Sequence, residues 1–451
     1  MPERATVTQG VQLGIEVVPG SLVPANRRLQ SISIEPEIHA ETNPFRAYGT
    51  KYDAVVPEGR EWTGATVVGI PTYNELQYIL ASCFANATPT QIMDGATPTG
   101  AYRWQYQPST TVEDTPQTYS VEQGSPVRGQ RFPYAIFSEF GLTWSRQKFD
   151  LNATMFGQRM QDGVALTANP TLNALIPMIP AQIDTFLDDT PGALGTTKFL
   201  RSLSGSFKLA NKFGPLWTLN SANTSWAAHI ETLPKLDLAM RVEADAAGMA
   251  LLNTLRAGAT KFFRLQLTGP SIYTAATVVA VVPPAPTLTT ATTGGTIPAG
   301  TYQVAISYTN ATGSTVTGPA STIVVPAGTA TNVINVAALT PLPTNATGVA
   351  AYVSQLGGAV LSLGVITPTT GAAATIAAIP AANSGATPAT NGTGLVQTYL
   401  FQLDIAAKIT KANKFADDAG VYAIEWPFVG VHDGTFGRAI QATLINTSAS
   451  L

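Results

Sequence analysis

Three histidines and two pairs of adjacent aspartates are the residues whose chemistry could build a metal or catalytic site in this sequence. His39, His229 and His432 are scattered along the chain, and no two have a spacing suited to binding one ion. Asp188-Asp189 stands in FLDDTPG and Asp417-Asp418 in FADDAGVY, and such stretches are typical of solvated turns. We therefore predict no metal site.

The motifs of nucleophilic and phosphate-binding enzymes are also missing. The sequence contains no G-x-S-x-G elbow, no G-x-x-x-x-G-K-[ST] loop and no strand-linked G-x-G-x-x-G. Its single cysteine, Cys83, falls on the apolar stripe of a predicted helix, which favours a small core residue over a reactive thiol. We therefore predict that the protein is not an enzyme and has no catalytic residue and no cofactor.

The composition narrows the classes of partner. With 451 residues, the chain is long enough for roughly two to four domains. A formal net charge of -3 argues against a protein that grips nucleic-acid phosphates. Apolar runs such as 274–282 are shorter than the roughly 20 residues that span a bilayer. The N-terminal stretch MPERATVTQG has no apolar region of the kind found in secretory signals. We expect no membrane segment and no signal peptide.

Short alternating segments separated by Gly, Pro and Asn predict an all-β chain with two flanking helices. The first helix is expected over 71–84, where Thr72 and Glu75 have the spacing of a capping box. The second is expected to begin after Asp245 as its N-cap and to end before Gly258.

One order of elements occurs twice in the chain: strands, a tryptophan, a capped helix, and then long strands. The two occurrences are Trp62, 72–84 and 134–158, and Trp226, 245–257 and 399–431. In the long strands, YAIFSEFGLTWSRQKF is matched by YLFQLDIAAKITKANKF, with an aromatic start, an acidic and a basic residue, and a closing Lys-Phe. The pattern indicates an internal duplication.

A stretch without any Asp, Glu, Lys, Arg or His interrupts the second copy, from Leu265 to Leu403. Within it, short alternating strands such as GTYQVAISYTN are separated by turn residues, and PPAP and NGTG bracket them like linkers. This spacing predicts an immunoglobulin-like sandwich without a disulfide, and GTYQVAISYTNATG is similar to a strand-and-turn pattern of fibronectin type III modules. The alternative is a low-complexity Ala/Thr linker.

These patterns give the following expected division of the chain. It comprises an N-terminal arm (1–30), a first half (31–165), a linker (166–198), the first part of a second half (199–282), an inserted immunoglobulin-like domain (283–394) and the second part of that half (395–451).

Three stretches of the sequence together resemble the major tail tube proteins of long-tailed bacteriophages. They are GIEVVPGSLVPANRRL, YDAVVPEGREWTGATVVGIPTYNELQYIL and FADDAGVYAIEWPFVGVHDGTFGRAIQATLINT. The resemblance covers most of 10–280 and 396–451, through diffuse motifs. It implies duplicated tail-tube domains, each of two packed antiparallel sheets flanked by a helix, with an immunoglobulin-like domain inserted in the second. Family members often carry that domain at the C-terminus instead.

The resemblance also implies a function and partners. The protein would be a structural component of the virion, assembled in the host cytoplasm, whose rings stack into the hollow tail tube. If six tube domains close a ring and each chain supplies two, three chains form it with pseudo-sixfold symmetry. DNA and the tape measure protein would lie in the lumen transiently, and the tail terminator and distal tail proteins would bind the tube ends, with no membrane contact.

The long strands supply the candidate residues for the lumen, which we expect to be polar with a modest acidic excess. They are Glu139, Thr143, Ser145 and Gln147 in one copy, and Gln402, Asp404, Lys408 and Thr410 in the other. Alternation predicts two faces without telling which one lines the bore. We expect 1–30 and 85–132 to stack the rings, so that deleting 1–20 would leave soluble protein that does not polymerise.

Two other functions remain open from the sequence. One is a different structural protein of the tail end, or a tube-like protein of a bacterial secretion apparatus. The other, from a different class, is a surface carbohydrate-binding protein with an immunoglobulin-like module.

Overall fold

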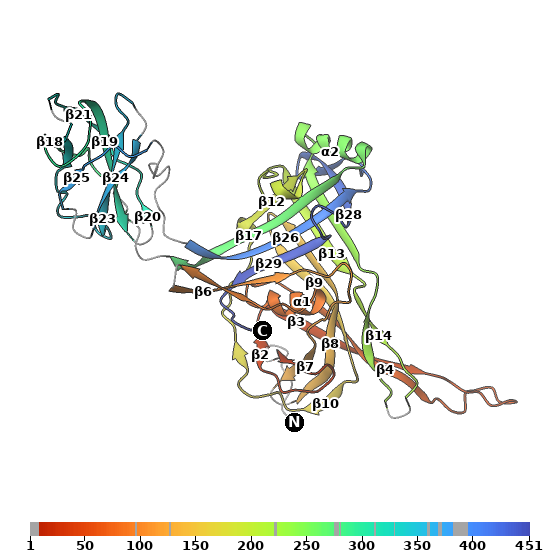
Figure 1. The fold of residues 1–451 in the computed structure, drawn as a ribbon. Helices are drawn as coiled ribbons and strands as arrows, with labels where there is room; N and C mark the ends of the chain where they lie inside the picture. Colours follow the sequence, from red (N-terminus) through yellow and green to blue (C-terminus); the bar gives the residue numbers. More distant parts are fainter. Residues whose placement is uncertain are drawn as a thin grey trace. The chain divides into compact units, whose positions relative to one another are not determined.

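Strands make up most of the chain, and the described residues contain two α-helices, which confirms the predicted all-β class with two helices. The computed structural model describes residues 9–94, 97–125, 128–220, 223–274, 279, 281–310, 313–328, 330–358, 361–368, 372–381 and 396–451. The chain divides into two units (Figure 1), and each is described by itself. Unit 1 comprises 1–93, 98–272 and 398–451, and unit 2 comprises 94–97 and 273–397.

The bounds of the elements are as follows. Up to the second helix they are β1 (Gly10–Ile15), β2 (Arg27–Leu29), β3 (Ile32–Thr42), β4 (Glu58–Gly69), α1 (Leu76–Cys83), β5 (Thr90–Asp94), β6 (Thr97–Tyr106), β7 (Tyr119–Ser125), β8 (Arg128–Ser145), β9 (Phe149–Gly157), β10 (Gln161–Val164), β11 (Thr171–Leu172), β12 (Ile183–Asp188), β13 (Ser202–Ala210), β14 (Phe213–Leu216), β15 (Ala228–Glu231), β16 (Lys235–Glu243) and α2 (Ala246–Ala257). After it come β17 (Thr260–Thr274), β18 (Leu288–Ala291), β19 (Gly300–Asn310), β20 (Gly313–Ser314), β21 (Ser321–Val325), β22 (Val333–Val336), β23 (Gly348–Ser354), β24 (Leu361–Pro368), β25 (Ala374–Ile376), β26 (Val396–Ile409), β27 (Ala416–Asp418), β28 (Val421–Gly430) and β29 (Ile440–Asn446).

One antiparallel sheet of unit 1 runs through both predicted halves of the chain. Its strands follow one another in the order β3-β4-β9-β8-β13-β16-β28-β26, and we call it the front sheet. The strands from β3 to β8 come from the predicted first half, and those from β13 to β26 from the second. The pairing of β8 with β13 joins the halves.

The two halves build their parts of the front sheet in the same way. In the first, the hairpin β3–β4 is followed by α1 and later by the hairpin β8–β9, and β4 pairs with β9. In the second, β13 and β16 are followed by α2 and later by β26 and β28, and β16 pairs with β28. The same chain order thus gives the same sheet order twice, as a duplicated sequence would.

Behind the front sheet, the long strands β8 and β26 continue into further sheets. The first part of β8 pairs with β7 and β10, and β7 pairs with β1. The first part of β26 pairs with β29 and β17. β29 pairs further with β6, and β17 pairs further with β12. The core lies between these layers and contains α1, whose residues are all buried. Phe84 packs edge-on against Phe140 of β8 at 6.1 Å between ring centroids.

The local signals predict α2 better than α1. Asp245 accepts a hydrogen bond from the backbone N–H of Gly248 at 2.8 Å, and Gly258 ends the helix with a φ of 60°, which confirms the prediction. The helix predicted from residue 71 begins only at Leu76. Thr72 does accept from the N–H of Glu75 at 3.2 Å, but the Glu75 carboxylate accepts from the N–H groups of Gln30 and Ser31, so no capping box closes.

The predicted N-terminal arm, 1–30, is not a separate arm in its described part, residues 9–30. β1 pairs with both β2 and β7, and Val11 and Leu13 are buried in the core. The Glu16 carboxylate is 3% exposed and is bound by donors from distant segments, among them the Ser120 hydroxyl at 2.8 Å and the Tyr134 N–H at 2.9 Å. This segment is part of the sheet framework of unit 1.

Two other segments predicted as connections also contain strands. The stretch 85–132, predicted to be a stacking loop, contains β5, β6 and β7, and Trp104 of β6 is buried opposite Leu444 of β29. The predicted linker 166–198 contains β11 and β12, and β12 pairs with β17. β6, β11 and β12 pair with strands that lie far away in the sequence, namely β29, β2 and β17, which local turn signals do not reveal.

Unit 2 contains two sheets that share one hydrophobic core. One has β18, β22 and β25, and the other has β20, β19, β23 and β24, with β21 also pairing with β19. Tyr302, Val304 and Ile306 of β19 alternate into this core, as the sequence pattern predicts. The predicted inserted domain, 283–394, lies within unit 2. Most of both predicted halves lies in unit 1, but 94–97, 273–282 and 395–397 belong to unit 2. The immunoglobulin-like assignment stays a prediction.

A helix able to cross a membrane is not found among the described residues, because neither α1 nor α2 is long and apolar enough.

Candidate assembly surface

The front sheet has one apolar, buried side and one polar side. The apolar side is filled by residues such as Leu142, Phe207 and Leu238, which are at most 3% exposed. Side chains alternate between the faces of a strand. The residues between them, in a row through Thr143, Ser206 and Ala239, therefore lie on the polar side, and they are exposed or half-buried. We call this side the open face.

Three of the predicted lumen residues from the first half lie on the open face, all on β8. Thr143 is exposed and Ser145 is half-buried. The Glu139 carboxylate is half-buried and forms an ion pair with Lys208 of β13 at 2.8 Å, which crosses the junction between the halves. The fourth candidate, Gln147, is exposed in the turn between β8 and β9.

Two predicted residues from the second half have similar positions. Lys408 is exposed on β26, and the register places it in one row with Val429, Asp237 and Lys208. Thr410 is exposed just beyond the end of β26, where its hydroxyl donates to the Pro427 carbonyl at 3.1 Å.

The other two predicted residues are not free polar side chains of an open surface. Asp404 is 7% exposed and forms a bidentate ion pair with Arg264 of β17, at 2.7 and 2.8 Å. Gln402 is half-buried and donates to the side-chain oxygen of Gln266 at 2.7 Å. Both tie β26 to β17, and we therefore remove Asp404 from the lumen candidates. The contacts with β17 could not be predicted, because the alternation of side chains along β26 carries no information about which strand lies beside it.

Charge on the open face is mixed, and much of it is paired. Its strands carry the carboxylates of Glu35, Glu37, Glu139, Asp150, Asp237, Glu243 and Glu425, and the cations of Lys208, Lys235, Arg241 and Lys408. Lys235 pairs with Asp237 at 2.7 Å, and Arg241 pairs with Asp418 at 2.8 Å. The carboxylates outnumber the cations, so the face has an acidic excess.

A long hairpin carries exposed apolar side chains beyond the front sheet. β4 pairs with β9 from Thr63 to Gly69, and the chain between β3 and the start of that pairing projects beyond it, as Figure 1 shows at the orange ribbons beside β4. We call residues 39–62 the β3–β4 extension. Its apolar tip side chains are 55% to 108% exposed. They are Phe45, Tyr48, Tyr52, Val55 and Val56.

The second half has a matching feature. The stretch between β13 and β16 contains the hairpin β14–β15, which likewise bears exposed apolar side chains. They are Leu216, Leu219, Ile230 and Leu233. Both halves thus carry exposed apolar side chains at corresponding places.

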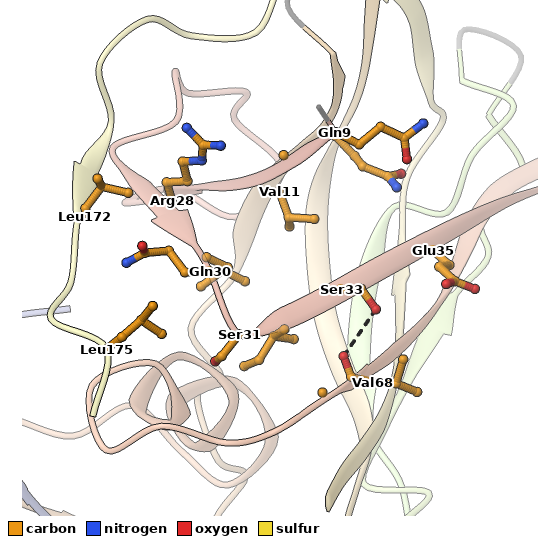
Figure 2. A pocket seen from close by; sticks show the side chains of 15 residues that line it. Gln9, Val11, Arg28, Gln30, Ser31, Ser33, Glu35, Val68, Leu172 and Leu175 are labelled. Atoms are coloured by element: carbon orange, nitrogen blue, oxygen red, sulfur yellow. Dashed lines mark hydrogen bonds between the residues drawn. The ribbon is translucent and has the colours of Figure 1, made fainter. Parts of the chain in front are cut away.

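The first strand of the front sheet borders a groove of about 850 Å³, drawn in Figure 2. Ser33 and Glu35 of β3 line it on one side, and Val11 and Arg28 line it from β1 and β2. Among the described strands, β3 pairs only with β4, so its other edge offers backbone groups to a further strand.

Several of the residues considered for metal or catalytic chemistry have contacts within the fold. His39 stacks on Trp62, and His229 lies 3.2 Å from the Tyr134 hydroxyl, where burial lowers the pKa of its imidazole. Asp188, predicted to lie in a solvated turn, instead is 3% exposed at the end of β12, where its carboxylate accepts from the N–H groups of Gly195 and Thr197. Within the described part of the chain, no group of three or more His, Cys, Asp or Glu residues is placed to hold a metal ion.

Comparison with known proteins adds no relative: neither a model of a protein family nor a curated protein matches the chain.

Proposed function

We propose that this protein is a structural subunit whose copies assemble side by side and end to end into a hollow tube, as in the tail of a long-tailed bacteriophage. The observation that carries the proposal is the open face, a polar surface that runs unbroken across strands of both halves. A sheet with one face in the core and a polar second face is suited to lining a water-filled lumen.

Closing the front sheets of several copies into one barrel would also remove their exposed edges. An unpaired edge such as that of β3 invites pairing with another chain, and closure satisfies its backbone groups. Within the chain, β8 of the first half already pairs with β13, the first front-sheet strand of the second half. This junction is a model for how one copy would meet the next.

The acidic excess of the open face fits a conduit for DNA. A surface rich in unpaired Lys and Arg would bind phosphates and hold the DNA back. Here Lys208 is neutralised by Glu139 and Lys235 by Asp237. DNA and a tape measure protein would therefore be transient occupants of the lumen, and other tail proteins would bind the ends of the tube. In this proposal the protein has no catalytic activity.

End-to-end contacts are assigned to the two projecting hairpins rather than to the N-terminal segment. The tip of the β3–β4 extension exposes Tyr48 and Tyr52, which are 108% and 82% exposed and free to pack on a neighbouring copy. Aromatic side chains of this kind are enriched at protein interfaces.

Electron microscopy of the purified protein tests the proposal. We expect long hollow filaments, and averaged cross-sections with three chains per ring, because each chain contributes two copies of the front-sheet arrangement. Six chains per ring would contradict the ring model, and isolated particles at high protein concentration would contradict the proposed function.

A variant separates end-to-end contacts from folding. The double change Tyr48→Ser and Tyr52→Ser should abolish long filaments while the melting temperature stays unchanged, because both rings are exposed. Val324→Ser is the matched control, since Val324 is an exposed apolar residue of unit 2, and its filaments should be normal. Normal filaments from the double variant would contradict the role of the tip.

A further inference from the structure

The β3–β4 extension is a two-stranded ribbon. Beyond Thr63, β4 no longer pairs with β9, and Trp62 pairs with His39 on β3. A ribbon of two strands is at best marginally stable in water. Contacts from outside the ribbon are therefore needed to hold it in one direction.

Trp217, which follows β14 in the second half, supplies such a contact. Its ring meets Trp62 edge-on at 5.6 Å between centroids, and the Arg60 guanidinium lies 4.8 Å from its centroid. Trp62 stacks on His39 at 4.9 Å, and Arg60 forms a bidentate ion pair with Glu41 at 2.8 and 2.6 Å. Trp217 thus contacts β4 directly and is linked to His39 and Glu41 of β3 through Trp62 and Arg60.

Two polar contacts fix the base of the ribbon beside this aromatic group. The Glu61 N–H donates to the Thr224 carbonyl at 3.1 Å, which joins β4 to the segment between β14 and β15. The Glu61 carboxylate pairs with Arg159, which follows β9, at 2.9 Å. Trp226 of the same hairpin is fully buried, and its indole N–H donates to the Gly157 carbonyl at 3.0 Å. The hairpin is therefore anchored in the core and can act as a rigid support.

We propose that Trp217 is a positioning residue that fixes the direction of the β3–β4 extension, so that the hairpin of one half holds the projecting tip of the other. Trp217 is half-buried and touches no part of the tip itself that the structure describes. The positioning role belongs to the single chain. Its consequence for end-to-end assembly rests on the proposed function.

Hydrogen exchange of the amide groups tests the role on the unassembled full-length protein. In Trp217→Ala, exchange across 39–42 and 58–62 should accelerate about tenfold, since an aromatic pair and a cation–π contact are lost together. Exchange in β8 and β9 should stay unchanged. Trp217→Phe keeps an aromatic ring and should accelerate exchange less. Leu219→Ala is the matched control, because Leu219 lies in the same hairpin and is fully exposed.

Equal exchange of the ribbon in Trp217→Ala, Leu219→Ala and the unchanged protein would overturn the proposal. If Trp217→Ala does not fold, Trp217→Leu serves as the test, because it removes the aromatic ring and keeps a large apolar side chain. Faster ribbon exchange in Trp217→Leu supports the proposal, and unchanged exchange overturns it. Filaments are scored separately: their absence from the unchanged protein would contradict the proposed function and leave the exchange result standing.

Discussion

Cys83 lies in α1 with no exposed surface, and burial raises the pKa of its thiol to about 12. Because the thiolate is the reactive form, we expect iodoacetamide to leave the native protein unlabelled at pH 8 and to label it fully in denaturant. Mass spectrometry of the two samples checks this. Rapid labelling of the native protein would mean that α1 opens readily.

The raised pKa of the Cys83 thiol also predicts how the free energy of unfolding changes with pH. The ordinary pKa of this thiol is 9.0, so the unfolded chain loses its proton first as the pH rises from 9 towards 12. Over that window, the free energy of unfolding falls, and below it the thiol has no effect.

Single residues could be predicted from the sequence where the decisive contact is local. The burial of Cys83 follows from its place on the apolar stripe of α1, and the role of Asp245 follows from its position before α2. Asp404 was misplaced because its partner, Arg264, lies 140 residues away on another strand. The contact between Trp217 and Trp62 could not be predicted for the same reason, since no spacing in the sequence links the two residues.

At the scale of elements, the N-terminal segment gives a test that distinguishes a free arm from a core strand. Deleting residues 1–20 removes β1, the buried side chain of Leu13 and the carboxylate of Glu16, which accepts from Thr118, Ser120 and Tyr134. Donors left buried without an acceptor cost about 1–3 kcal/mol each. We therefore expect this deletion to lower the melting temperature strongly or to abolish soluble protein.

Deleting residues 1–8 is the matched control, because it leaves β1 and Glu16 in place, and we expect an unchanged melting temperature. Soluble, cooperatively folding protein from the longer deletion would show that β1 is dispensable. That outcome would restore the sequence-based prediction of an arm.

Elements were predicted well where periodicity and turn residues decide, and poorly where pairing is distant. The long strands β8 and β28 alternate clearly and were expected. Strand β6, within 85–132, was missed because its partner β29 lies at the other end of the chain. The start of α1 was missed because the Glu75 carboxylate accepts hydrogen bonds from the N–H groups of Gln30 and Ser31, outside the helix, and does not cap the helix.

At the scale of the whole molecule, duplication and insertion explain the chain's length and order. Both halves contribute the same strand order to one sheet, so in the proposed tube a single chain would supply two units of the ring wall. Unit 2 is encoded between β17 and β26, which are neighbouring strands of unit 1. Its hydrophobic core is separate from the core of unit 1. A short turn between β17 and β26 would therefore leave every strand of the front sheet intact.

This arrangement predicts the effect of removing unit 2. Replacing residues 275–395 by an Asn-Gly turn, which suits a tight connection between adjacent strands, should give a folded chain that still forms filaments of the same bore. Circular dichroism and electron microscopy measure the two properties. Replacing residues 43–57 by the same turn is the matched control, because it should leave the fold intact and remove the filaments. A chain without unit 2 that folds but forms no filaments, under conditions where the unchanged protein does, would mean that unit 2 contributes to the wall itself.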